Sequence, residues 1–131
     1  MKNRLVINSI DRIDLINFDD LIYINSSGKY STFITADNRK ITSSNNLGSY
    51  IGELPTQQFV RVHNSYIVNL SFIQSIVKGE IWEILLTTGE KIPVSRRRKD
   101  DHLLIVLKTR LTFLLFLRNI DREFSRYYYF Y

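Results

Sequence analysis

Turn-forming residues divide the chain into short runs between residues 4 and 93, and this spacing constrains the fold more than any other feature. The runs are rich in Val, Ile, Thr, Tyr and Phe, which fit the pleated, half-buried surface of a β-sheet. The clearest turn signals are Ser26-Ser27-Gly28, Asp37-Asn38-Arg39 and Thr88-Gly89. Short runs bounded by turns about every 8–12 residues predict a mainly β fold of the sandwich type.

A short helix is predicted near residues 46–54. Apolar side chains recur there at the i, i+3, i+4, i+7 spacing of one helix face: Leu47, Tyr50, Ile51 and Leu54. Either asparagine of Asn45-Asn46 can cap its start, and Pro55 marks its end. Gly48 and Gly52 lower the helix propensity, so we expect this helix to be short and to depend on packing.

A second helix is predicted near residues 101–123, starting at the acidic pair Asp100-Asp101. Its segment 103–117 is apolar at all but four positions, and its apolar runs are too short for a membrane span, which needs about 20 residues. A helix that is apolar around most of its circumference favours burial on more than one side. We therefore interpret residues 108–131 as a helical and aromatic extension that packs on the same domain or on a partner. Residues 103–131 are a candidate homodimer contact, and membrane contact is the weaker alternative.

Composition narrows the class of function. The formal net charge of +5 and the pI near 9.6 favour a polyanionic partner such as nucleic acid. The chain has no cysteine, which excludes disulfides and thiolate chemistry and fits a cytoplasmic location, and its N-terminus lacks a secretory signal. The sequence has no phosphate-binding glycine loop, nucleophile elbow or metal-binding histidine pair. We therefore expect no catalytic residues, no metal site and no cofactor.

The stretch FVRVHNSYIVNL, residues 59–70, sets polar residues into an apolar run. Its first four residues fit a strand that places Val60 and Val62 on one face. His63-Asn64-Ser65 then forms a polar break, in which Asn64 can bond the edge of adenine in a major groove. The alternative is a structural turn whose polar side chains satisfy local backbone groups.

A second polar segment, Arg96-Arg97-Arg98-Lys99, follows an expected strand through Lys91-Ile92-Pro93. Arginine can fork the O6 and N7 atoms of guanine or clamp a phosphate. The alternative is a solvated charge run, or one that pairs with the neighbouring Asp100-Asp101.

Together the two stretches resemble the LytTR DNA-binding domain of bacterial transcription regulators, over about residues 10–107. The first follows the family pattern Phe-x-Arg-hydrophobic-His-x-Ser ending in Val-Asn, and the second follows hydrophobic-Pro-Val-Ser-Arg after a glycine turn. The matching positions are Phe59, Arg61, His63, Ser65, Val68, Asn69, Gly89, Ile92, Pro93, Val94, Ser95 and Arg96. The resemblance implies an elongated sandwich of short antiparallel strands in small sheets. It also implies loop residues that enter successive major grooves on one face of DNA, and we expect the DNA-binding domain to span residues 1–107.

The same resemblance implies which side chains contact DNA. The base-reading candidates by position are Asn64 and Arg96, and a third contact falls on Lys29, Tyr30 or Ser31. The residues expected to contact phosphates or to orient the others are Lys29, His63, Ser65, Arg97 and Arg98.

The sequence thus predicts a non-enzymatic regulator that binds specific double-stranded DNA, with direct-repeat promoter sites, which are usual in the family, as its expected partner. One alternative is a protein-interaction or membrane-associated module that uses the C-terminal helix. Another is a single-strand binder whose exposed aromatic side chains stack on bases. Many family members carry a phosphate-accepting receiver domain before this one. Because the chain has no room for such a domain, we expect a standalone regulator or a fragment.

Overall fold

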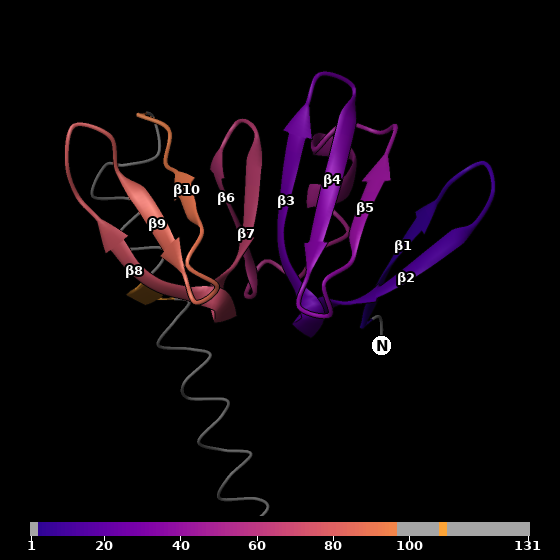
Figure 1. The fold of residues 1–131 in the computed structure, drawn as a ribbon, viewed down its shortest axis with the longest axis horizontal. Coiled ribbons are helices and arrows are strands. Elements are labelled where there is room, and N and C mark those ends of the chain that lie inside the picture. Colours follow the sequence, from indigo (N-terminus) through magenta and orange to yellow (C-terminus); the bar gives the residue numbers. More distant parts are fainter. Residues whose placement is uncertain (1–2, 97–107, 110–131) are drawn as a thin grey trace, which may run out of the picture.

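The computed structural model describes residues 3–96 and 108–109, and short strands dominate this part of the chain (Figure 1). The strands are β1 (Arg4–Asn8), β2 (Ile13–Asn17), β3 (Leu21–Ser27), β4 (Tyr30–Thr35), β5 (Lys40–Ser43), β6 (Phe59–His63), β7 (Tyr66–Asn69), β8 (Ile73–Val77), β9 (Glu83–Leu86) and β10 (Lys91–Pro93). The helical turns are η1 (Phe18–Asp20), α1 (Gly48–Ile51) and η2 (Leu70–Phe72).

Among the described residues, the strands form three small sheets. β1 and β2 make a hairpin, β5-β4-β3-β7-β6 make the central sheet, and β10-β9-β8 make a third sheet. Every pairing in them is antiparallel, and the sheets follow one another along the long axis of the molecule (Figure 1). The predicted fold, mainly β with short antiparallel strands in small sheets, is confirmed. The helix predicted near residues 101–123 lies outside the described residues except for Lys108 and Thr109, which are helical and exposed.

The central sheet is covered on both faces because apolar residues point alternately to two cores. Ile24, Phe33 and Ile67 pack in one core with the β1–β2 hairpin and α1. Val60, Val62 and Val68 pack in the other core with Ile84, Leu86 and Ile92 of the third sheet. The predicted placement of Val60 and Val62 on one face of a strand is therefore confirmed. This layering gives the central sheet, which carries the polar turn of the 59–70 motif, support from both sides.

The predicted helix near 46–54 is present as the single turn α1, Gly48–Ile51. The Asn46 side chain accepts a hydrogen bond from the Ser49 amide at 3.1 Å, as expected of a capping residue. The Tyr50 ring meets the Phe33 ring edge-on, with 4.9 Å between the ring centroids. The helix is shorter than its apolar pattern because glycine weakens it, so packing of Tyr50 holds it in place.

The predicted turns lie where glycine or asparagine permits left-handed backbone. Gly28 joins β3 to β4 with a φ of 59°, and Gly89 joins β9 to β10 with a φ of 94°. Asn38 has a φ of 64° in the turn between β4 and β5. An L-residue with a larger side chain is strained in this region of backbone space, and asparagine tolerates it better than most.

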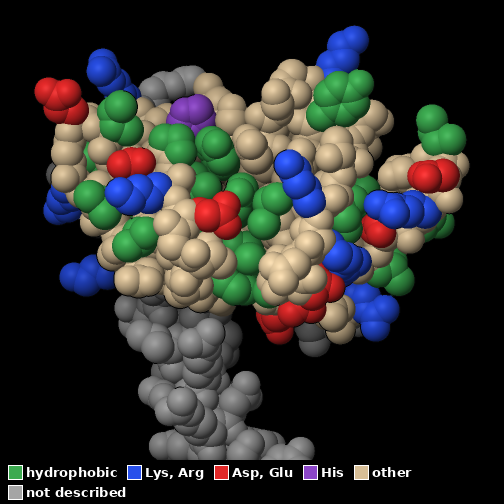
Figure 2. Space-filling view, viewed as in Figure 1, with side chains coloured by type: hydrophobic (Ala, Val, Ile, Leu, Met, Phe, Trp, Pro, Cys, Tyr) green, Lys and Arg blue, Asp and Glu red, His purple; other side chains and the backbone are tan. Residues whose placement is uncertain are grey.

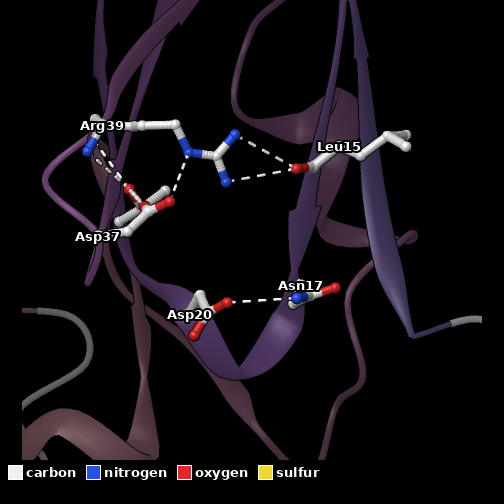
Figure 3. A network of polar contacts seen from close by, with 6 residues as sticks. Leu15, Asn17, Asp20, Asp37 and Arg39 are labelled. Carbon is white, nitrogen blue, oxygen red and sulfur yellow. Dashed lines mark hydrogen bonds and ion pairs between the residues drawn. The ribbon is translucent and has the colours of Figure 1, made fainter.

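The β4–β5 turn also ties the β1–β2 hairpin to the central sheet (Figure 3). Its Arg39 guanidinium donates to the Leu15 carbonyl at 3.4 Å and pairs with Asp37 at 2.9 Å. The Thr35 hydroxyl donates to the Asp37 carboxylate, and together with Arg39 it holds the pKa of Asp37 below its ordinary value. These contacts belong to the scaffold, because the turn lies at the edge of the molecule opposite the turn of the 59–70 motif (Figure 1).

Candidate nucleic-acid interface

The polar break of the 59–70 motif is a two-residue turn, Asn64-Ser65, between β6 and β7. Two side chains of β6 hold its backbone. The Arg61 guanidinium donates to the Asn64 carbonyl at 2.7 Å, and the Ser65 amide donates to Nδ1 of His63 at 3.1 Å. The His63 ring also meets the Tyr66 ring edge-on at 5.8 Å between centroids. Asn64 is therefore exposed on a turn whose backbone is fixed by hydrogen bonds to side chains of β6.

Two backbone hydrogen bonds place this turn between two other loops. The Ser26 amide, near the end of β3, donates to the Ser65 carbonyl at 2.8 Å. The Ser95 amide, just after β10, donates to the Val62 carbonyl at 2.9 Å. The β3–β4 turn (28–29), the β6–β7 turn (64–65) and residues 94–96 thus lie along one edge of the molecule, here called the loop edge (Figure 1). The three segments that the sequence predicted to contact DNA are brought together.

The β3–β4 turn presents two of its three candidate side chains. Lys29 is exposed, and Tyr30 is 56% exposed although it begins β4. Ser31 is fully buried, and its hydroxyl donates to the Asn45 carbonyl at 2.7 Å. Ser31 is therefore a scaffold residue, which leaves Lys29 and Tyr30 as the contacts available from this turn.

Residues 94–96 follow β10 and lead from a buried residue to an exposed one. Val94 packs in the second core, and its amide donates to the Trp82 carbonyl at 2.8 Å. Arg96, two residues on, is exposed. The backbone bonds of Val94 and Ser95 thus hold the start of the basic run against β6 and against Trp82, the residue before β9. The predicted contacts Arg97 and Arg98 lie outside the described residues.

The last residue of β7 has a different role from the turn. Asn69 is fully buried, and its amide donates to the carbonyls of Phe18 and Leu21 at 3.2 and 2.8 Å. Its side-chain oxygen accepts from the Ser71 amide at 2.9 Å. The 59–70 motif therefore combines an exposed turn with a buried polar tie to η1, β3 and η2.

Charge is distributed unevenly between the two long edges. In Figure 2, Lys and Arg side chains project from the upper edge above the β3–β4 turn and, next to an acidic side chain, at the β8–β9 end. The acidic side chains gather most densely at the lower edge near η1, which contains Asp19 and Asp20. The acidic cluster near η1 makes that part of the lower edge unfavourable for a polyanion.

Sequence reasoning missed the contacts that position the loops. Ser26 and Ser95 act through their backbone amides, which no sequence pattern distinguishes, and Arg61 acts through a local carbonyl. Lys78 is a missed candidate for a phosphate contact. It follows β8, on a connection that reaches the same edge of the molecule, and its ammonium lies 5.3 Å from the centroid of the Trp82 ring (Figure 1).

Within residues 3–96 and 108–109, no group of three or more His, Cys, Asp or Glu side chains lies close enough together to hold a metal ion. In the same part of the chain, no helix is both long enough and apolar enough to span a membrane.

Comparison with protein families identifies the fold that carries this edge. The model of the LytTr DNA-binding domain matches residues 11–103. The chain belongs to the LytTR family. The predicted resemblance is therefore confirmed.

Relatives and a solved structure agree with this assignment. The sensory transduction protein LytT of Enterococcus faecalis is 34% identical over 88 residues, which cover 66% of this chain and 36% of that protein. The heme-containing CO-sensing transcriptional regulator RcoM 2 of Paraburkholderia xenovorans is 32% identical over 90 residues, 66% of this chain and 33% of that protein. A LytTr DNA-binding domain from Bacillus cereus has the same fold, with a TM-score of 0.65, 23% identity and coverage of 74% of this chain and 90% of that one. The matched part of this chain spans only about a third of the length of these two relatives.

Proposed function

We propose that this LytTR domain regulates transcription by binding a specific sequence of double-stranded DNA along its loop edge. One observation carries the proposal: the hydrogen bonds from Ser26 to Ser65 and from Ser95 to Val62 bring three loops with exposed polar side chains to one edge. Membership of a DNA-binding family and the basic balance of the chain support the same function. Relatives named as sensory transduction proteins and as a CO-sensing transcriptional regulator fit a regulator of transcription.

The exposed side chains divide into two roles. Asn64 and Arg96 are the proposed base readers, because an amide can bond adenine in two places and a guanidinium can fork guanine. Tyr30 can donate one hydrogen bond from its hydroxyl or touch a thymine methyl. Lys29, Arg97 and Arg98 are proposed phosphate contacts, which set register and affinity without reading sequence. Ser65 is held as part of the turn, so we propose for it an orienting role.

The rest of the proposal concerns the whole chain. Residues 1–107 would form the DNA-binding domain, and residues 108–131 a helical and aromatic extension on the same domain or on a partner. The partner DNA would carry direct repeats, and residues 103–131 would supply a homodimer contact because of their apolar composition. The domain would act in the cytoplasm by binding, without catalysis and without a cofactor. No comparison supports the alternative of a protein-interaction or membrane-associated module.

Selection from a random duplex library at about 150 mM salt tests the function, with the Asn64→Ala, Arg96→Ala double variant run in parallel. We expect the wild type to enrich a recurring motif and the double variant to lose it. Each single variant should lose about 1–3 kcal/mol of discrimination at one base pair.

An Arg97→Ala variant is the matched control, because loss of a phosphate contact should weaken all duplexes evenly and reduce the salt slope by about one unit. Salt-sensitive binding without enrichment in either protein would refute base reading. A preference for single strands that depends on Tyr30 would instead indicate base stacking.

A further inference from the structure

We propose that His63 is a positioning residue for DNA recognition: its neutral imidazole and the Arg61 guanidinium together clamp the single peptide unit that presents Asn64. This inference rests on the proposed DNA-binding function, because it explains how the central loop keeps the geometry that recognition needs. It assigns His63 a role inside the protein, where sequence reasoning expected a phosphate or orienting contact.

The clamp acts on both ends of one peptide. The carbonyl of Asn64 and the amide of Ser65 belong to the same planar unit, and in a trans peptide these two groups point in opposite directions. Arg61 holds the carbonyl at 2.7 Å, and Nδ1 of His63 holds the amide at 3.1 Å. Because both dipoles are bound, rotation of the plane would break two hydrogen bonds at once.

This peptide is the one whose orientation distinguishes turn types. In a four-residue turn from His63 to Tyr66, it is the central peptide, and rotation of the central peptide converts a type I turn into a type II turn. The type II form needs a positive φ at its third residue, which is Ser65, and glycine or asparagine is preferred there. Ser65 does not have a positive φ in the structure. The clamp and the serine therefore favour the same orientation, and the Asn64 side chain keeps one direction.

The clamp requires a particular protonation state of His63. Nδ1 accepts a hydrogen bond only when it carries no proton, so the proton of the neutral ring is on Nε2. A second proton, added at acidic pH, turns Nδ1 into a donor that faces the Ser65 amide. The bond is then lost, and one end of the peptide is released.

The surroundings of His63 contain other charged and titratable groups. Arg61 is on the same strand, and Arg96 follows Ser95, whose amide bonds the carbonyl next to His63. Tyr66 on β7 contacts the imidazole ring, and the Tyr23 ring on β3 lies 6.3 Å from Tyr66. The Tyr23 hydroxyl donates to Glu90, which lies between β9 and β10.

Protonation should affect specific and non-specific DNA binding in opposite directions. A charged imidazole at the loop edge adds a cation, which strengthens binding to any duplex. Release of the turn weakens only the binding that depends on the placement of Asn64. If His63 simply contacted a phosphate, acidification would raise the affinity for both specific and non-specific DNA. The ratio of specific to non-specific affinity therefore distinguishes a clamp from a phosphate contact.

The experiment measures affinity for the selected operator and for a scrambled duplex at pH 7.5 and 5.5, in the 131-residue wild-type chain and three variants. His63→Asn keeps an acceptor near the position of Nδ1, and His63→Phe keeps a ring against Tyr66 but no acceptor. His102→Asn is the matched control because it removes the other imidazole of the chain. We expect the specificity ratio of wild type and His102→Asn to fall about fivefold at pH 5.5. His63→Asn should stay near the neutral wild-type ratio at both pH values, and His63→Phe should be low at both.

Nitrogen NMR of the DNA-free wild type supplies a second readout that needs neither an operator nor a variant. Imidazole shifts should show the Nε2–H form of His63 near neutral pH, and the Ser65 amide signal should move as His63 titrates. A ring protonated on Nδ1, or an unchanged specificity ratio in His63→Phe, would overturn the clamp. A correct tautomer in a protein that selects no operator would instead overturn the proposed function, and with it the role of the clamp in recognition.

Discussion

Replacing Asn69 by alanine should remove much of the stability of the domain while leaving the loop edge chemically intact. The side chain is fully buried and makes three hydrogen bonds, two to the carbonyls of Phe18 and Leu21 and one from the Ser71 amide. Each buried group left without its partner costs about 1–3 kcal/mol, and the partly exposed Ser71 amide can turn to water. The expected loss is therefore about 3–5 kcal/mol, a large share of the roughly 5–15 kcal/mol of a typical domain.

Urea unfolding followed by circular dichroism measures this loss. Asn69→Asp is the informative companion, since a carboxylate can still accept from Ser71 but cannot donate to the two carbonyls; it should destabilise at least as much as alanine. Asn64→Ala, on the exposed turn of the same motif, should change the free energy of unfolding by less than about 0.5 kcal/mol. A loss below about 1 kcal/mol for Asn69→Ala would show that these bonds do not tie β7 to its neighbours.

Two further predictions concern other parts of the chain. Tyr23→Phe should lower stability by about 1 kcal/mol in urea unfolding, because the hydroxyl donates to Glu90 at 2.5 Å. Burial, reinforced by Glu90, raises the pKa of Tyr23 above its ordinary value of 10.0. The contribution of the protonated hydroxyl to stability is therefore present below about pH 10 and is lost as the pH rises above that value. The free energy of unfolding of Tyr23→Phe should lack this loss at alkaline pH. Deleting residues 118–131 should lower the mass seen by light scattering if these residues supply the dimer contact, and a deletion protein of unchanged association state would contradict that role.

Most of the fold could be predicted from local sequence features, namely turn residues and the alternation of side chains along strands. The turns at Gly28 and Gly89 were predictable because glycine was placed where the backbone is left-handed. The placement of Val60 and Val62 on one face was predictable because side chains two positions apart on a strand point to the same face of the sheet. Within residues 3–96, the helix near 46–54 is shorter than predicted, since its apolar pattern extends beyond the one turn that the glycine-containing backbone sustains.

Long-range backbone contacts could not be predicted in the same way. The bond from Ser26 to Ser65 joins residues far apart in the chain, and any residue except proline could supply that amide. Ser31 was an eligible DNA contact by sequence, and only the tertiary structure shows it buried and bonded to the Asn45 carbonyl. The position of Asn64 in the sequence thus indicated a role for it, whereas its placement beside Tyr30 and Arg96 needed the assembled sheets.

The order of strands in the central sheet fixes the distance between two turns of the loop edge. Because β4-β3-β7-β6 are consecutive neighbours, the β3–β4 and β6–β7 turns stand two strand spacings apart, about 10 Å. DNA repeats its major groove about every 34 Å, so under the proposed function these two turns would share one groove, and a second groove would be contacted from another part of the loop edge. In the proposed mode of binding, substitutions at Tyr30 or Asn64 would change which base pairs the domain prefers. The interval between those base pairs would stay the same, since it is set by backbone hydrogen bonds that only a proline substitution removes.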